Sequence, residues 1–421
     1  MEEINQIQLQ EKWAPVLDSQ DAGKIADPHR RAVTAVVLEN QEKAFAQERA
    51  QITEVAANKT GGGVDNWDPV LISLVRRATP ALLAFDLVGV QPMTGPTGLI
   101  FAMKSRYTTQ GGDEALFDEA ATAFSGGGSG SGTASDNPFA GDSGDGDSVD
   151  DYTPGMGLST GAAEALGNTG NAIAEMAFSI DKTTVTAKSR ALKAEYTIEL
   201  AQDLKAVHGL SAETELANIL STEILAEMNR EIIRTINVNS VTSVLASGEY
   251  DMTDATDNAG ARWLVERVKS MVFAIEKEAN QIAVSTRRGK GNFVIVSHGV
   301  AAALNSAGAM DTGLGLSGPQ GFDSDATGSL FAGTLNGRMK VYIDPYAAVD
   351  YYTVGYKGTN PYDAGIFYCP YVPLSMMKTI GESDFQPRIG FKTRYGLADN
   401  PFVTAGAGAN VYYRKRKVLA L

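Results

Sequence analysis

One stretch of this chain cannot belong to a packed core. Between Arg106 and Lys182 lie 75 residues without a lysine or arginine, and they carry 13 aspartates and glutamates. The stretch includes glycine-rich runs at 126–132 and 141–147. Such a composition buries too little apolar surface to offset the cost of ordering the backbone. We therefore expect a disordered, acidic, Gly/Ser-rich tip over residues 108–172.

Apolar segments flank this acidic stretch on both sides. Residues 99–107 predict a strand, and Met176, Phe178 and Ile180 alternate with polar residues as in a second strand. Two strands on either side of one long excursion predict an extended hairpin. The acidic stretch would then form its tip.

The charge of the chain is concentrated in the same stretch. The formal net charge is −14, the stretch accounts for −13, and the remainder sums to about −1. No basic stripe typical of a nucleic-acid footprint is present. The tail Arg414, Lys415, Arg416 and Lys417 is the only basic cluster. We interpret it as a solvated terminal run.

Composition excludes several other classes of protein. No run approaches the roughly 18–20 apolar residues that a membrane span needs, and the acidic start Met1, Glu2, Glu3 does not resemble a signal peptide. The single cysteine, Cys369, excludes a disulfide framework and a cysteine-based zinc site. We expect synthesis in the cytoplasm.

Periodicity outlines a mixed α and β body, and we assign the α+β class. Residues 1–57 predict a charged helical leader, followed by a glycine hinge or plain linker at 58–63. Helices are predicted over 187–207, ending at Gly209, over 212–236 with Ser211 as cap, and over 264–282. Strands are predicted over 292–297, 339–343, 351–356, 365–371 and 388–395.

A search for chemistry finds little. The three histidines, His29, His208 and His298, have no metal-binding spacing. A GxGxxG match at 313–318 does not follow a strand and open a helix, and the aspartates at 142–151 do not fit a calcium loop. The sequence therefore predicts no catalytic residues, cofactor or metal, and a building block rather than an enzyme. An enzyme with an unrecognised site is a remaining alternative.

Several core segments resemble one known family. They are LAFDLVGVQPMT at 83–94, AKSR at 187–190, YTIELAQDL at 196–204, EMNRE at 227–231, GKGNF at 289–293, VYID at 341–344, YTVGYKG at 352–358, FQP at 385–387 and FKTRYG at 391–396. In this order they resemble the major capsid (head) protein of T4-like tailed bacteriophages. They cover most of residues 66–402 outside the acidic stretch.

The resemblance implies an HK97-like capsid fold with an N-terminal arm, an extended loop, a peripheral domain with a long spine helix, and an axial domain. The implied domains are a cleaved propeptide at 1–54, the arm and start of the body at 55–96, the extended loop at 97–186, the peripheral domain at 187–239, the axial domain at 240–375, and a return to the peripheral domain with the C-terminus at 376–421.

The resemblance also implies processing. Family members are trimmed by a phage prohead protease after a hydrophobic-x-Glu motif. Ile52, Thr53 and Glu54 fit this motif and place the cut before Val55. A weaker match at 37–39 lies inside a better helix.

The function that follows from the resemblance is a major capsid protein of the virion. It would assemble with itself into hexamers that build an icosahedral head enclosing double-stranded DNA without sequence-specific binding. A pentameric vertex protein, a scaffold, the prohead protease and decoration proteins would be its partners, with no membrane. The alternative is an encapsulin-like nanocompartment shell of the same fold, which would lack a cleaved leader.

Overall fold

The computed structural model describes residues 2–18, 25, 27–52, 82–116, 124–126, 157–167, 173–243, 248–252, 263–311, 323–324, 330–360, 362–380, 386–401 and 408–419. Contacts divide the chain into two units. The first contains residues 1–100, 183–282 and 289–421, and the second contains residues 101–182 and 283–288.

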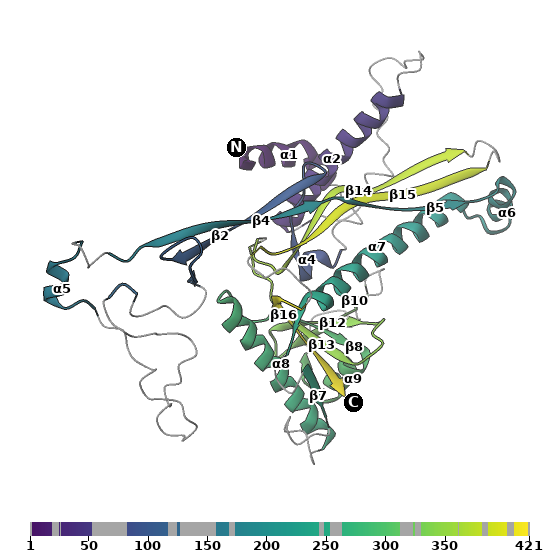
Figure 1. Ribbon diagram of the computed structural model, residues 1–421. Coiled ribbons are helices and arrows are strands. Elements are labelled where there is room, and N and C mark those ends of the chain that lie inside the picture. Colours follow the sequence, from purple (N-terminus) through teal and green to yellow (C-terminus); the bar gives the residue numbers. More distant parts are fainter. Residues whose placement is uncertain are drawn as a thin grey trace. The chain divides into compact units, whose positions relative to one another are not determined.

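Helices and strands are both abundant, so the predicted α+β class is confirmed (Figure 1). The helices are α1 (Glu2–Leu17), α2 (Pro28–Ile52), α4 (Ala84–Leu87), α5 (Thr160–Glu164), α6 (Ile198–His208), α7 (Ala212–Asn239), α8 (Leu264–Thr286) and α9 (His298–Ser306). The strands are β1 (Gly89–Val90), β2 (Thr97–Tyr107), β3 (Glu114–Ala115), β4 (Met176–Thr186), β5 (Lys188–Glu195), β6 (Ser240–Thr242), β7 (Glu249–Asp251), β8 (Phe293–Ser297), β9 (Met310–Asp311), β10 (Asp323–Ser324), β11 (Leu330–Leu335), β12 (Met339–Asp344), β13 (Tyr351–Gly355), β14 (Ile366–Ile380), β15 (Pro387–Asp399) and β16 (Asn410–Leu419).

The long helix α7 confirms the prediction made from its periodicity. Apolar side chains at intervals of four residues are buried along one face. They are Leu220, Ile224, Met228, Ile232 and Ile236. Ser211 occupies the N-cap position, although its side chain makes no capping hydrogen bond. The predicted helix 264–282 is likewise present as α8, and Gly209 ends α6 with φ +69°.

One helix prediction is wrong in its first half. Residues 187–207 are not a continuous helix, because β5 precedes α6. β5 is rich in Ala, Lys and Leu, which favour helix. Its backbone pairs antiparallel with β15, from Lys188 opposite Tyr395 to Glu195 opposite Arg388. Tertiary pairing therefore overrides local propensity here.

β5 is an edge strand of a four-stranded sheet with the order β1-β14-β15-β5. Leu192 and Ala194 alternate with exposed residues on β5 and pack against the core cluster that also contains the buried residues of α7. β14 runs across residue 375. The expected domain boundary at 375/376 therefore lies inside a strand.

The first unit also contains a nine-stranded sheet. Its main order is β10-β11-β12-β8-β13-β16-β6, with β7 added at β16 and β9 at β11. All five residues of the central strand β8 are buried. Phe293 and Ile295 belong to the core cluster of α7, whereas Val294 and Val296 belong to a second cluster with α8 and α9. Helices therefore cover both faces, and the side chains of β8 alternate between two cores.

The second unit contains most of a long antiparallel ribbon. β2 and β4 pair in a three-stranded sheet with β3 on the other side of β2. The two predicted strands of the hairpin are thus confirmed. Most of the expected disordered tip lies outside the described residues. Within it, β3 pairs with β2, and α5 forms with its N-cap Ser159 accepting from the amide of Ala162.

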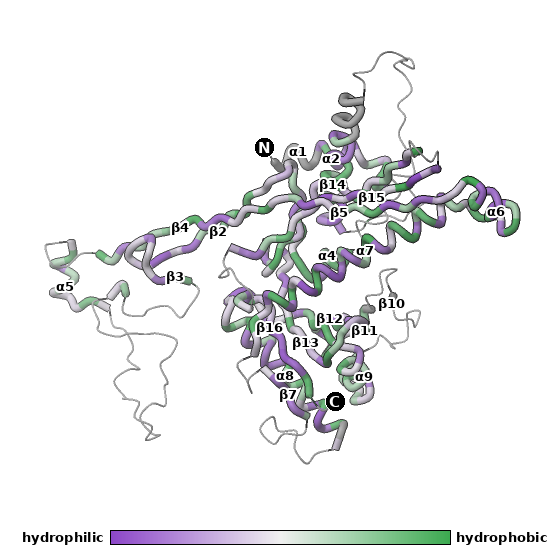
Figure 2. The backbone as a smooth tube through the Cα atoms, turned by 45° about the vertical axis from the view of Figure 1, so that its right-hand side comes forward, coloured by the Kyte–Doolittle hydropathy of each residue, from purple (hydrophilic) through white to green (hydrophobic). Residues whose placement is uncertain are grey.

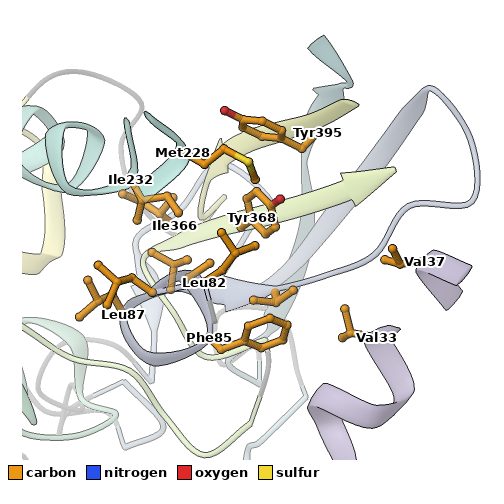
Figure 3. Packing of buried hydrophobic residues seen from close by; sticks show 14 of the residues in the cluster. Val33, Val37, Leu82, Phe85, Leu87, Met228, Ile232, Ile366, Tyr368 and Tyr395 are labelled. Atoms are coloured by element: carbon orange, nitrogen blue, oxygen red, sulfur yellow. The ribbon is translucent and has the colours of Figure 1, made fainter. Parts of the chain in front are cut away.

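The leader is helical where the structure describes it, as the sequence predicts. α1 and α2 contribute buried side chains to the core cluster that also contains α4 and α7. Figure 3 shows Val33 and Val37 extending from α2 toward the part of this cluster that holds Phe85 and Leu82. None of the helices in the described ranges is long and apolar enough to cross a membrane.

Candidate assembly and processing surfaces

One face of α2 contacts the body of the first unit. Arg30, Val33, Val37 and Asn40 follow one another at intervals of three or four residues and therefore share this face. The Arg30 Nη2 lies 3.0 Å from Asp86 Oδ1. Its guanidinium also lies 5.2 Å from the centroid of the Phe85 ring, a cation–π distance. We call this the body face of α2.

Asn40 fixes the other end of the body face. Its Nδ2 donates to the carbonyl of Met93 at 2.7 Å and to the carbonyl of Tyr371 at 3.0 Å. The Asn40 side chain is buried, and a buried amide needs partners for its hydrogens. Backbone oxygens of the body supply them.

A different face of α2 contacts α1. The Arg31 guanidinium donates two hydrogen bonds to the carboxylate of Asp18, at 3.0 and 2.9 Å. Lys12 Nζ lies 2.8 Å from Glu39 Oε2 and 2.5 Å from Glu42 Oε2. These contacts hold the two leader helices together and do not involve the body.

Two titratable groups lie beside the Arg30–Asp86 pair. The imidazole of His29 packs edge-on against Phe85, with ring centroids 6.5 Å apart. Lys357 donates from Nζ to the carbonyl of Phe85. Burial lowers the pKa of Lys357 to about 8 and also lowers the pKa of His29. The docked leader therefore favours the neutral form of both groups, whereas the carboxylates of Asp86 and Asp27 oppose this for Lys357, and that of Asp27 opposes it for His29.

The predicted processing residues lie at the end of the leader. α2 ends at Ile52, whereas Thr53, Glu54 and Val55 lie outside the described residues. The weaker match at 37–39 is inside α2, where Val37 and Leu38 are buried. Glu39 there accepts from Lys12 and from Trp13 Nε1. Because proteases cut exposed, adaptable segments, the docked helix protects this match.

The ribbon of β2 and β4 has two chemically different faces. Lys104 Nζ lies 3.0 Å from Asp181 Oδ2, and Arg106 Nε donates to Ser179 Oγ at 3.3 Å. These residues share the polar face, so their sequence neighbours point to the opposite face. That opposite face carries large apolar side chains that are 55–65% exposed: Phe101, Met103, Met176, Phe178 and Ile180. We call it the apolar ribbon face.

A second exposed apolar surface lies at α6. No residue of α6 is buried, although Figure 2 shows hydrophobic as well as hydrophilic turns in it. Ile198, Leu200 and Val207 on α6, with Leu210 and Ile219 after it, are exposed. Monomeric proteins rarely leave such groups of large apolar side chains in water.

Polar networks fasten α7 between the two sheets of the first unit. Arg190 of β5 reaches Glu227 at 3.0 Å and Glu231 at 2.7 Å, while Tyr395 of β15 donates to Glu231. The pKa of Tyr395 is raised by burial and by this carboxylate. On the nine-stranded sheet, Arg230 pairs with Asp344 at 2.6 Å. The sequence singled out neither network; only the four-residue spacing of Glu227 and Glu231 hinted at a shared face.

The histidines and the cysteine considered in the sequence search lie in separate elements of the fold. His208 and His298 are exposed at the end of α6 and the start of α9. Cys369 is buried, and burial raises the pKa of its thiol to about 12. Among the residues that the structure describes, no group of three or more His, Cys, Asp or Glu side chains could hold a metal ion.

Comparison with known proteins gives a consistent result. The family described as major capsid protein Gp23 matches residues 64–418. The major capsid protein of Salmonella phage ViI is 39% identical, with 98% of each chain covered. That of Enterobacteria phage T4 is 38% identical over 96% of this chain and 93% of the relative. The T4 capsid vertex protein is 30% identical over 55% of each chain.

Solved capsids are also similar. The capsid of Myoviridae phage XM1 covers 88% of this chain and 98% of that chain at 8% identity, with a TM-score of 0.40.

The chain is therefore a structural protein of a viral shell, a class in which apolar surfaces exposed on one subunit are expected. More narrowly, it belongs to the Gp23 major capsid protein family of T4-like bacteriophages and forms the capsid of the virion. The resemblance predicted from the sequence is confirmed.

Proposed function

We propose that this chain builds the icosahedral phage head as hexamers in the HK97-type arrangement, and that the head encloses double-stranded DNA without sequence-specific binding. The observation that carries the proposal is the apolar ribbon face, which a lone subunit leaves in water. A neighbouring copy would cover it. Heterologous contacts of this kind close into rings when the rotation between subunits permits.

Many weak contacts suit such a shell. Each subunit would bind several neighbours, so the effective concentration of every further contact is high and the whole lattice is stable. Weak individual contacts also let a misplaced subunit leave. In this scheme the four-stranded sheet with α7 is the peripheral domain, the nine-stranded sheet is the axial domain, and the ribbon is the extended loop of residues 97–186.

The ribbon contact can be tested with two neighbouring residues. Phe178→Asp places a charge on the apolar ribbon face, and Ser179→Asp places the same charge on the polar face beside Arg106. We expect electron microscopy to show closed particles with Ser179→Asp and none with Phe178→Asp. Equal assembly of both variants would contradict the role of this face.

We further propose that maturation removes the leader by a cut between Glu54 and Val55. The support is the Ile52-Thr53-Glu54 motif, which begins at the last residue of α2, together with the protection of the match at Glu39. Coexpression with the prohead protease should give subunits that begin at Val55. Glu54→Ala should assemble at full length, whereas Glu39→Ala should be trimmed normally; trimming of Glu54→Ala would refute the site.

The remaining partners are part of the same proposal. Similarity to a capsid vertex protein supports a related pentameric partner at the vertices. A scaffold, the prohead protease and decoration proteins complete the set, and the role of this chain is purely structural. The encapsulin-like alternative has no observation in its favour, and mass spectrometry of assembled subunits would distinguish it by an uncut leader.

The acidic stretch is proposed to lie outside the filled head, since its charge repels DNA at short range. Proteolysis of intact, filled heads should cut it. Complete protection would contradict this placement.

A further inference from the structure

We propose that the leader is a non-covalently held ligand of its own body, so that cutting the chain after residue 54 does not by itself release it. Dissociation, rather than scission, would then open the surface beneath it. The inference rests on the proposed removal of the leader, and it concerns the step that follows the cut.

The apolar contact between the leader and the body does not depend on the peptide chain that links them. Val33 and Val37 on the body face of α2 are at most 2% exposed, and Phe85 and Leu82 of the body are at most 6% exposed. Figure 3 shows these side chains in one cluster. They lie before residue 52 and after residue 81. A cut after residue 54 removes none of them.

The polar contacts are equally independent of the cut. Arg30 pairs with Asp86, and Asn40 donates to two backbone carbonyls, those of Met93 and Tyr371. These partners come from three separate stretches of the body: α4, the segment after β1, and β14. The Asn40 amide is the donor in both hydrogen bonds, one of them buried and the other partly buried, so its removal leaves each carbonyl without this donor.

The intact chain contributes only proximity. The covalent link raises the effective concentration of the leader near its binding surface on the body. Loss of the link weakens binding of the leader without altering any contact. The leader also keeps its own shape, because Arg31–Asp18 and Lys12–Glu42 join α1 to α2. We therefore infer a folded helical pair that remains bound until a second event displaces it. The weaker cleavage match at Glu39 becomes accessible only after that event.

The test uses the full chain with residues 53–60 replaced by the recognition sequence of a site-specific protease. After cutting, size-exclusion chromatography and mass spectrometry follow the leader peptide. We expect it to co-elute with the body. Loss of the peptide within the first separation would overturn the proposal. Because another protease makes the cut, failure of the prohead protease to cut at Glu54 would refute only the proposed processing site.

Two variants test which contacts hold the leader on the body. Arg30→Ala with Asn40→Ala removes the polar contacts of both side chains to the body, together with the Arg30–Asp27 pair inside the leader, and we expect the leader to dissociate about tenfold faster or more. Glu42→Ala removes a contact inside the leader and should release it at the unmodified rate. Equal rates for both variants would overturn the assigned contacts.

Two further measurements guard against misfolding. Arg30→Lys, made instead of Arg30→Ala, keeps a positive charge beside Asp86. After the cut, this variant should hold the leader on the body nearly as long as the unmodified chain does. Hydrogen exchange over residues 84–93 should be unchanged by the cut alone and should increase when the double variant loses its leader. Increased exchange on cutting the unmodified chain would contradict a leader that stays in place.

Discussion

Arg230 Nη1 lies 2.6 Å from Asp344 Oδ1, and the Asp344 side chain is only 1% exposed. Tyr351 also donates to this carboxylate, at 2.7 Å. Although burial opposes ionisation, these donors hold the pKa of Asp344 below its usual value. The pair joins α7 to β12 and so fastens the long helix to the nine-stranded sheet.

Arg230→Ala should destabilise the chain by about 3 kcal/mol, because it leaves a buried carboxylate without its cation. Urea unfolding measures the loss. Arg234→Ala, at an exposed position of the same helix, is the control and should change stability by less than about 0.5 kcal/mol. Since the pKa of Asp344 is lowered on folding, its contribution is present above its unfolded pKa and is lost as the pH falls through the folded pKa.

Packing of α7 against both sheets predicts a second large effect. Ile236 is fully buried, and Ile236→Ala should cost about 2–5 kcal/mol through the cavity it leaves. Val238, two residues on, is exposed, and Val238→Ala should be nearly neutral. Similar midpoints for both variants in urea would show that the helix does not pack as described.

His29 predicts a pH dependence of the leader contact. Burial lowers its pKa below the usual 6.5, with Lys357 and Arg30 acting in the same direction and Asp27 against it. The folded chain therefore favours the neutral imidazole. Its contribution to stability is full above pH 6.5 and falls as the pH drops through the lower folded pKa.

Hydrogen exchange over α2 between pH 7 and 5 should detect this loosening, and His29→Gln should reduce its pH dependence. An unchanged dependence in His29→Gln would assign the effect to other groups.

Cys369 predicts a chemical probe of folding. Its buried thiol has a pKa raised to about 12, so almost no thiolate forms at neutral pH. A thiol reagent should modify the native chain far more slowly than the chain in denaturant. Fast modification of the native chain would mean that β14 opens readily.

Local pattern was sufficient for the long helices and for most strands. α7 and α8 have apolar residues at helical spacing, and the ribbon strands alternate with a period of two, so each was predictable from neighbours in the sequence. β5 was not, because Lys188–Glu195 is composed of helix-favouring residues and becomes a strand only through its pairing with β15.

The candidate surfaces also differ in how far the sequence predicts them. The apolar residues of β4 could be recognised in the sequence, whereas the contacts of the leader could not. Nothing near Asn40 in the sequence reveals that its amide meets carbonyls 53 and 331 residues away. A charged helical leader is equally compatible with a solvated helix.

By itself, the sequence determined the α+β class, the family and the long helices, because residue order and short-range spacing suffice for these. Only the tertiary structure decided that β5 is a strand, that Arg230 meets Asp344, and that the leader is seated on the body. Each of these depends on groups that are distant along the chain and become neighbours only when the apolar residues between them are buried together.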